Sequence, residues 1–369
     1  MSPRSETAAD TDAPHLRRAL ELAQGGRGSV APNPLVGAVV VRDGEVIGEG
    51  FHGELGGPHA EVAALADCAA RGNDPAGATM VVTLEPCAHH GRQPPCTDAI
   101  LAAGIARVVI GSDDPTEKAS GRGPGMLREA GIEVAFAQGP DAAASRLLDQ
   151  GFRKHARTGM PLVAHKAAVS LDGVTASGAG PRWISGPESR GLVHRWRAEM
   201  GAIAVGIGTA LTDDPLLTAR EVGAARQPLR VVFDRAARLP LSSQLARTAG
   251  ESPVLVVAGP DAPPDRVRAL EAAGVAVATA GSIPEALAEL GGRDVNSLLL
   301  EGGATLAGAF LRAGELDELR LFIAPVLLGG GRPLYADVPE GLAQASQPLE
   351  TTHERSGADV LVRARMREW

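Results

Sequence analysis

The sequence has few aromatic residues, few cysteines and no long apolar segment. Only 3% of the 369 residues are aromatic and three are cysteine, so neither the stacking surface of a nucleic-acid binder nor a disulfide framework is expected. No run of about 18 apolar residues is present. Residues 1–13 lack the basic start and apolar centre of a signal peptide. These absences predict a cytoplasmic protein that has no membrane partner.

Basic charge is scarce as well. The 36 Lys and Arg residues face 44 Asp and Glu residues, which gives a net charge of −8. Nucleic-acid binding depends on clustered cations, so this charge argues against a polyanionic partner. Scattered arginines can still hold one phosphate group, and we expect a small phosphorylated substrate. The length favours two α/β domains, each with its own core, and a homo-oligomer is the ordinary assembly for a two-domain cytoplasmic protein of this kind.

The most informative segment combines His59-Ala60-Glu61 with Pro86-Cys87 and Cys96. One imidazole and two thiolates leave the fourth position of a zinc ion open for water, as in catalytic sites. Zinc lowers the pKa of that water, and Glu61 is placed to transfer protons without binding metal. The pattern resembles the H-x-E and P-C-x-x-C signature of nucleobase deaminases, with a longer interval between the cysteines. It predicts hydrolytic deamination with zinc on His59, Cys87 and Cys96.

A structural zinc site is the alternative interpretation of these ligands. His89 or His90 would then supply a fourth ligand and close the site. Glu61 beside the first ligand favours catalysis, since a structural site needs no such carboxylate. The third cysteine, Cys68, lies in an alanine-rich run with helical spacing and is expected to be a small buried residue.

A longer set of motifs is more specific than the zinc ligands. Its members are residues 32–37, 50–52, 83–96 and 121–123. Together they resemble the deaminase half of the bifunctional riboflavin-biosynthesis deaminase/reductase family. The resemblance implies a cytidine-deaminase-like three-layer α/β/α domain and places Asn33 and His52 at the substrate.

Strand and helix patterns alternate along the whole chain. A polar tail over residues 1–13 precedes a first domain over 14–155, and a second domain is expected over 160–369 after a boundary near 153–160. A hairpin crosses Asp43-Gly44. Further strands are predicted at 79–84, 108–111, 162–164, 202–206, 229–233, 254–258, 275–279, 297–300 and 319–323, with helices at 14–25, 59–71, 97–103, 265–273 and 305–312.

The second half carries motifs that resemble the reductase half of the same family, which is similar in fold to dihydrofolate reductase. These motifs are residues 166–173, 183–185, 205–209, 213–215 and 301–303. The resemblance implies NADPH as cofactor and Lys166 as a catalytic residue. It implies substrate contacts for Pro181, Arg197, Leu217, Arg220 and Glu301. It implies NADPH contacts for Ala168, Trp183, Thr209, Asp213, Gly303, Ala304, Thr305, Leu306, Ala307, Gly308 and Ala309.

Each reductase motif also has a simpler interpretation. Gly302-Gly303 follows a strand and opens a helix, where bare amides can meet a phosphate, but paired glycines also form ordinary tight turns. Lys166 is either a proton donor to the sugar or one member of an ion pair. Trp183 fits a core position as well as a cofactor contact.

Four residues depart from the family pattern. Gln93 stands where the family has Thr, and Thr116 stands where it has Asn. The difference at position 116 replaces a planar amide by a shorter hydroxyl in the pyrimidine region. Gly201 and Arg235 depart in the second half. An added arginine favours a phosphate-bearing cofactor.

The leading hypothesis is a riboflavin-biosynthesis enzyme that deaminates a diamino-ribosylaminopyrimidinone 5′-phosphate and then reduces its ribosyl group to a ribityl chain. One alternative is a zinc deaminase of another pyrimidine nucleotide with an inactive second domain. The other is a non-enzymatic nucleic-acid-binding protein with a structural zinc, which the acidic charge and the scarcity of aromatics disfavour.

Overall fold

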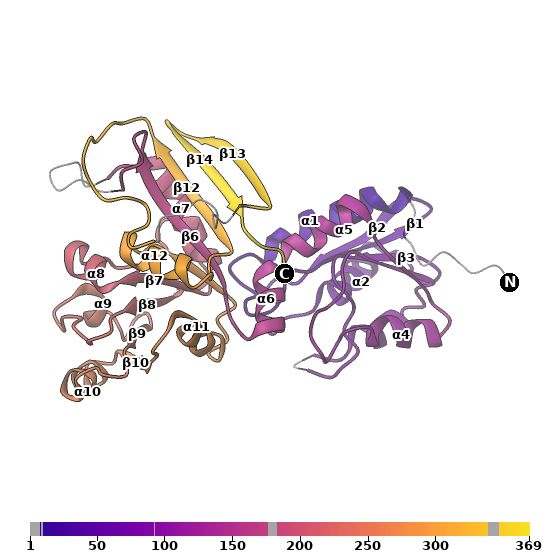
Figure 1. Cartoon of the computed structure of the whole chain (residues 1–369). Helices are drawn as coiled ribbons and strands as arrows, with labels where there is room; N and C mark the ends of the chain where they lie inside the picture. Colours follow the sequence, from indigo (N-terminus) through magenta and orange to yellow (C-terminus); the bar gives the residue numbers. More distant parts are fainter. Residues whose placement is uncertain (1–7, 9, 92, 176–182, 339–346) are drawn as a thin grey trace. The chain divides into compact units, whose positions relative to one another are not determined.

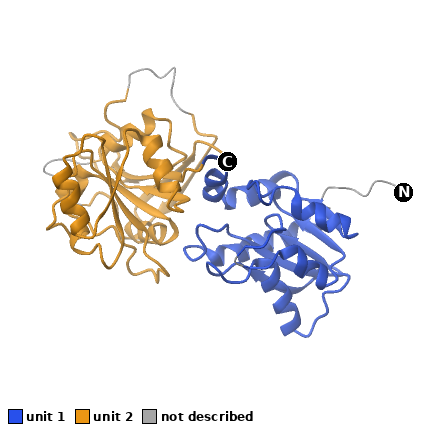
Figure 2. Cartoon of the chain, turned by 90° about the horizontal axis from the view of Figure 1, so that it is seen from below, with its two compact units in different colours: residues 1–158, 369 blue, residues 159–368 orange. Residues whose placement is uncertain are grey.

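The computed structural model describes residues 8, 10–91, 93–175, 183–338 and 347–369. The chain divides into two compact units (Figure 2): unit 1 comprises residues 1–158 with Trp369, and unit 2 comprises 159–368. Helix α6 (Gln150–Thr158) occupies most of the stretch that the sequence suggested as a boundary. The chain divides after Thr158, at the end of this helix and inside the predicted stretch of 153–160. Arg153 and Lys154 are buried in the helix.

Unit 1 is built on a five-stranded mixed sheet with strand order β2-β1-β3-β4-β5 (Figure 1). The strands are β1 (Gly37–Arg42), β2 (Glu45–Phe51), β3 (Thr79–Val82), β4 (Arg107–Ile110) and β5 (Glu133–Phe136). β1 is antiparallel to β2 and β3, whereas β3, β4 and β5 are parallel. The β1–β2 hairpin turns at Asp43 and Gly44, which both have positive φ, as this two-residue turn requires.

Helices cover both faces of this sheet. The described helices of unit 1 are η1 (Asp10–Asp12), α1 (Ala13–Ala23), η2 (Gln24–Gly26), α2 (Ala60–Ala70), α3 (Cys96–Ala102), α4 (Arg122–Glu129), α5 (Gly139–Leu148) and α6. One core joins the sheet to α2, α3 and α4, and a second joins its other face to α1. The three-layer α/β/α prediction is therefore confirmed, and the layers bring the starts of α2 and α3 together.

Unit 2 contains a nine-stranded sheet with strand order β10-β9-β8-β7-β11-β6-β12-β14-β13. All neighbours from β10 to β12 run parallel, and β14 and β13 add an antiparallel hairpin at the edge. The strands are β6 (Leu162–Ser170), β7 (Ala202–Gly206), β8 (Leu229–Phe233), β9 (Val254–Ala258), β10 (Ala276–Thr279), β11 (Ser297–Leu300), β12 (Glu318–Ala324), β13 (Glu350–Ser356) and β14 (Asp359–Arg365).

The parallel strands of unit 2 are joined by helices, as parallel connections require. These are α7 (Pro187–Glu199), α8 (Ile207–Asp213), α9 (Gln244–Arg247), α10 (Pro264–Ala272), α11 (Ile283–Gly291) and α12 (Ala304–Arg312). A buried cluster joins the sheet to α11 and α12. The predicted dihydrofolate-reductase-like α/β architecture is confirmed. Its central strands β6, β11 and β7 position the residues of the second site.

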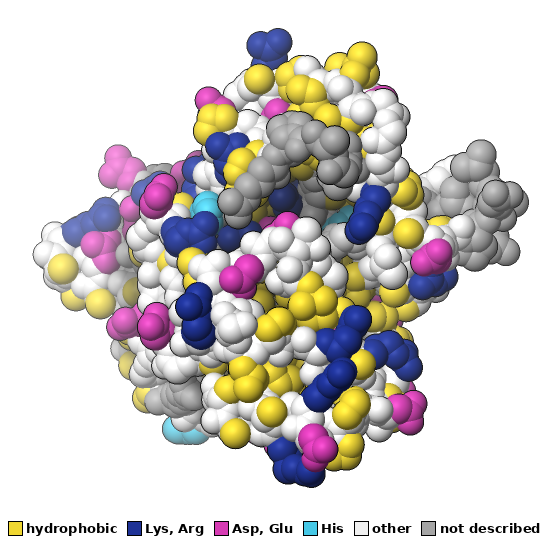
Figure 3. Space-filling view, turned by 90° about the vertical axis from the view of Figure 1, so that its left-hand side faces the viewer, with side chains coloured by type: hydrophobic (Ala, Val, Ile, Leu, Met, Phe, Trp, Pro, Cys, Tyr) yellow, Lys and Arg dark blue, Asp and Glu magenta, His cyan; other side chains and the backbone are white. Residues whose placement is uncertain are grey.

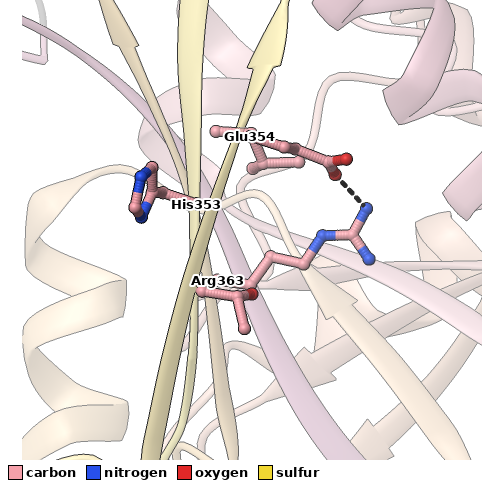
Figure 4. A pocket seen from close by; sticks show the side chains of 5 residues that line it. His353, Glu354 and Arg363 are labelled. Carbon is pink, nitrogen blue, oxygen red and sulfur yellow. Dashed lines mark hydrogen bonds and ion pairs between the residues drawn. The ribbon is translucent and has the colours of Figure 1, made fainter.

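The described surface has mixed charge and includes a shallow pocket on the edge hairpin of unit 2. On the face in Figure 3, Lys and Arg side chains are interspersed with Asp and Glu and form no continuous basic surface. Thr352, His353, Glu354, Leu361 and Arg363 line an open pocket of about 250 Å³ on β13 and β14, where Glu354 pairs with Arg363 at 2.8 Å (Figure 4). Within the described residues, no helix has the length and apolar character to cross a membrane.

Candidate functional site

The predicted zinc ligands of unit 1 lie together. His59 is the N-cap residue of α2, Cys96 is the first residue of α3, and Cys87 lies between β3 and α3. Their ligand atoms are all within 4.8 Å of one another. His59 Nδ1 is 3.2 Å from Cys96 Sγ and 3.6 Å from Cys87 Sγ. This is the donor set and spacing that zinc takes, with one position left for water.

The two thiols influence each other strongly. The hydrogen bond from the Cys96 thiol lowers the pKa of Cys87 to about 4, and the His59 ring contributes in the same direction. The same contact, together with burial, raises the pKa of Cys96. A divalent cation between them stabilises both thiolates. The three side chains therefore fit a zinc ion, which would replace the proton of the hydrogen bond between the two thiols.

Glu61 lies in the first turn of α2, two residues after the His59 ligand. Its side chain is only 3% exposed. Burial raises the pKa of this carboxyl to about 7, with the nearby Cys87 acting in the same direction and the His59 ring opposing it. A carboxyl group that gains and loses a proton near neutral pH suits general acid–base chemistry.

His52 and Asn33 form a hydrogen-bonded pair beside the zinc ligands. The Pro58 carbonyl can only accept, so His52 Nδ1 donates to it at 3.0 Å, and His52 Nε2 accepts from Asn33 Nδ2 at 3.1 Å. The His52 and His59 rings meet edge to face with centroids 5.4 Å apart. Burial lowers the pKa of His52, which keeps it neutral. One side of the Asn33 amide is thus fixed by His52.

A buried carboxylate that holds the loop of Asn33 was not predicted from the sequence. The Asp149 carboxylate accepts the Leu35 backbone N–H at 2.7 Å, 114 residues along the chain. Asp149 is 7% exposed, and burial raises its pKa to about 7. Only the fold brings Asp149 next to this loop, so no local motif could have indicated it.

Two residues that depart from the family pattern, Thr116 in the predicted pyrimidine region and Gln93, have their polar groups engaged within the protein. The Thr116 hydroxyl donates to Asp114 Oδ1 at 2.7 Å, and Gln93 Nε2 donates to the Gly56 carbonyl at 2.8 Å. Thr116 therefore presents no free donor where the family has an amide. Among the described residues, the cluster of possible metal ligands contains neither His89 nor His90, so the proposed fourth ligand of a structural site is not seen.

We expect Cys96→Ser to lose zinc. The substitution replaces a soft thiolate by a hydroxyl that does not ionise near neutral pH, and it keeps the size of the buried side chain. The measurement is zinc per chain by atomic emission, with Cys68→Ser as the matched control. Zinc at wild-type stoichiometry in Cys96→Ser would contradict the ligand assignment.

In unit 2, the pairing of β6 with β11 brings the central residues of the predicted reductase site together. Leu300 of β11 pairs with His165 of β6, so Lys166 and Glu301 follow at neighbouring positions on adjacent strands. Arg197 of α7 forms a bidentate ion pair with Glu301, with distances of 2.7 and 2.8 Å. Both side chains are largely buried, at 13% and 10% exposure. Three charged groups from three elements therefore share one site.

The electrostatics of this group favour an ionised carboxylate and a labile amine. Burial would raise the pKa of Glu301, but the Arg197 guanidinium outweighs it and the pKa lies at about 2. Burial also lowers the pKa of Lys166, with Glu301 opposing and Arg197 reinforcing that shift. Among the described residues Lys166 has no hydrogen-bond partner.

The loop after α8 carries two further predicted substrate residues. Leu217 is buried with φ of 54°, a conformation that costs free energy for a bulky residue. Arg220 is exposed, and its side chain contacts Thr218 Oγ1 at 3.0 Å. Arg197 reaches the same loop, because its Nη1 donates to the Thr218 carbonyl at 3.2 Å.

Eight of the predicted NADPH residues, Thr209 and residues 303–309, lie on α12 or beside its start. Gly303 is its N-cap residue, and a Cβ built there would lie 3.7 Å from Thr209 Oγ1 of α8. Gly303 and Thr305 are exposed, and Leu306 and Ala309 are half-buried. Ala304, Ala307 and Gly308 are buried, and Gly308 packs so closely on the Ala336 carbonyl that a Cβ would lie 2.0 Å from it. The exposed first turn can receive a phosphate.

The remaining predicted residues have separate positions. Ala168 lies on β6 opposite Phe322 of β12, and Asp213 is the exposed last residue of α8. Trp183 is 58% exposed with Arg190 over its ring, so it is not a core tryptophan. Pro181 lies outside the described residues. Arg235 is exposed just after β8.

Comparison with known proteins matches both halves of this arrangement. Residues 9–112 match the cytidine and deoxycytidylate deaminase zinc-binding region, and residues 161–361 match the RibD C-terminal domain. The riboflavin biosynthesis protein RibD of Escherichia coli is 41% identical over 371 residues, covering 94% of this chain and 97% of the relative. The chain belongs to the RibD family. RibD of Actinobacillus pleuropneumoniae is 38% identical, covering 95% and 94%.

Solved RibD structures share the fold of the whole chain. Acinetobacter baumannii RibD superposes with a TM-score of 0.87 at 37% identity and covers 97% of this chain and 99% of its own. A deaminase/reductase from Thermotoga maritima gives 0.86 at 36% identity with the same coverage. The protein is therefore a bifunctional riboflavin-biosynthesis enzyme that has a zinc deaminase domain and an NADPH-dependent reductase domain.

Proposed function

We propose that the chain deaminates diaminohydroxyphosphoribosylaminopyrimidine and then reduces 5-amino-6-(5-phosphoribosylamino)uracil, the two activities in the name of the Thermotoga relative. The observation that carries the proposal is the presence of two separate sites in one chain: a His, Cys, Cys cluster beside buried Glu61, and Lys166 beside the Arg197–Glu301 pair. We assign the deaminase to residues 14–155 and the reductase to 160–369.

In the deaminase site, His59, Cys87 and Cys96 hold zinc. When bound, zinc supplies an activated water for attack on the amidine carbon of the pyrimidine. Glu61 transfers the two protons of that water, one to the adjacent ring nitrogen and one to the departing amine. The amine leaves as ammonia, and the carbon becomes a carbonyl. Asn33 is held by His52 on one side and presents the rest of its amide to the ring. Burial of Glu61 excludes competing solvent.

In the reductase site, the chain orients the substrate against the cofactor. NADPH supplies a hydride to C1′ of the ribosyl group, the bond from C1′ to the ring oxygen breaks, and the ring oxygen takes a proton. Lys166 is our proton donor, since burial lowers its pKa. Glu301 keeps Arg197 in place through two hydrogen bonds. Arg220 and Arg197 hold the 5′-phosphate, with Leu217 and Pro181 completing the substrate contacts.

NADPH lies along α8 and α12 in this proposal. The exposed amides at Gly303 and the first turn of α12 bind a cofactor phosphate at the positive end of the helix. Thr209, Asp213, Ala168 and Trp183 complete the cofactor contacts, together with the rest of 303–309. These residues would hold the cofactor at the carboxyl ends of β6, β7 and β11, where α/β sheets bind ligands.

We further propose a cytoplasmic homo-oligomer that has no nucleic-acid partner. Thiolate zinc ligands persist in a reducing compartment, and the net charge of −8 disfavours polyanions. Closed homo-oligomers are the commonest state of enzymes of this type.

The test follows the substrate through two steps. Zinc-loaded protein is incubated with diaminohydroxyphosphoribosylaminopyrimidine, first without and then with NADPH, and products are identified by mass spectrometry. We expect one amine to become a carbonyl without NADPH and two hydrogens to be gained with it. Deamination without reduction would favour the alternative of an inactive second domain, and an unchanged substrate would refute the assignment.

A further inference from the structure

Helix α7 holds the Arg220 loop through two side chains one turn apart. Arg197 Nη1 donates to the Thr218 carbonyl at 3.2 Å. His194, three residues earlier on the same face, accepts the Arg220 backbone N–H at Nδ1 over 3.3 Å. Because positions i and i+3 are neighbours on a helix, both contacts reach the same short segment of the loop.

The loop needs this support because its backbone is strained. Asp214, Leu217 and Glu221 have φ of 39°, 54° and 61°, a region that non-glycine residues adopt at a cost. Arg220 lies within this segment and has no carboxylate partner among the described residues. Its guanidinium meets Thr218 Oγ1 at 3.0 Å and the His194 ring at 3.5 Å. An unpaired guanidinium held in this way is available to an anionic ligand.

The tautomer of His194 follows from its partners. A neutral imidazole has one acceptor nitrogen. Nδ1 accepts the Arg220 N–H, so the proton is on Nε2 and the 3.5 Å approach of Arg220 Nη2 is a packing contact. Partial burial and the charges of Arg197 and Arg220 lower the pKa of His194, whereas a hydrogen bond to the Thr218 backbone and the charge of Glu301 raise it. The balance favours the neutral ring that this contact requires.

We propose that His194 is a positioning residue of the reductase, which fixes the Arg220 loop through Nδ1 so that Arg220 meets the 5′-phosphate of the substrate. The proposal rests on the phosphate role of Arg220 given under the proposed function. In this role His194 acts through the Arg220 loop and not on the reacting sugar carbon or the cofactor. Its loss is therefore expected to weaken substrate binding and to leave NADPH binding unchanged.

Two amide substitutions separate this role from a general packing role. In His194→Asn the amide oxygen can take the place of Nδ1, whereas in His194→Gln the amide extends to the position of Nε2. We expect His194→Gln to raise the KM for 5-amino-6-(5-phosphoribosylamino)uracil about tenfold, and His194→Asn to stay within about twofold of wild type, as the loss of one hydrogen bond predicts. The KM for NADPH should not change in either variant.

The controls distinguish the failure of this proposal from that of the underlying function. Arg195→Gln changes an exposed position of the same helix and should match wild type. The dephosphorylated substrate should react equally with wild type and His194→Gln. Equal KM values for the Asn and Gln variants would overturn the role of His194. If Arg220→Ala left the KM of the phosphorylated substrate unchanged, the phosphate role of Arg220 would fail instead.

Discussion

Glu61→Gln is expected to lower the deaminase kcat by a factor of about 10² to 10⁴, the usual contribution of a positioned general acid–base. The amide keeps the size of the side chain but can neither accept nor deliver a proton. Because the substitution leaves His59, Cys87 and Cys96 intact, zinc per chain should remain at the wild-type value. The measurement is ammonia release from diaminohydroxyphosphoribosylaminopyrimidine under single-turnover conditions.

The reductase provides an internal control for this variant. Supplied with 5-amino-6-(5-phosphoribosylamino)uracil, Glu61→Gln should oxidise NADPH at the wild-type rate, because Glu61 and Lys166 lie in separate units. A zinc-replete Glu61→Gln protein that released ammonia at the wild-type rate would show that another group transfers the proton.

Glu301→Gln is expected to abolish reduction and to destabilise unit 2 by about 3–5 kcal/mol, the cost of leaving one member of a buried ion pair without its partner. Arg197 is 13% exposed, so water screens its charge poorly. Hydrogen exchange of β6 and β11 measures this loss separately from unit 1. The double variant Arg197→Met, Glu301→Gln removes both charges and should regain much of the stability but none of the reductase activity.

The Arg197–Glu301 pair also makes the stability of unit 2 depend on pH in the acid range. Arg197 holds the pKa of Glu301 at about 2, below its usual 4.5. The folded state thus binds the proton less readily than the unfolded chain, so the contribution is complete above about pH 4.5 and is lost as the pH falls towards 2. Identical acid unfolding of wild type and the double variant would show that the pair contributes no stability.

In unit 2, the buried strands could be predicted from the sequence, whereas the hairpin at the edge of the sheet could not. The strands β7, β8, β9 and β11 begin and end where the apolar runs indicated, since a strand buried on both faces is a continuous apolar run. The β13–β14 hairpin was not predicted. β13 is exposed along six of its seven residues, so it shows no alternation between apolar and polar positions.

The two sites also differed in how far the sequence indicated their residues. His59 and Glu61 lie two residues apart at one helix start, so a local motif was sufficient to indicate them. Arg197 and Glu301 are 104 residues apart, and their pairing depends on the order of the strands in the sheet. His194 has no motif at all, and its contact with Arg220 follows only from the packing of α7 against a strained loop.

A double-label experiment tests whether one chain carries out both reactions, deamination first and reduction second. Wild-type protein is given diaminohydroxyphosphoribosylaminopyrimidine in heavy-oxygen water with NADPH deuterated at both C4 positions, and the product is analysed by mass spectrometry. We expect a ribitylaminouracil phosphate with heavy oxygen on the pyrimidine carbon and one deuterium on the former C1′. A product that carries only one of the labels, or neither, would contradict it.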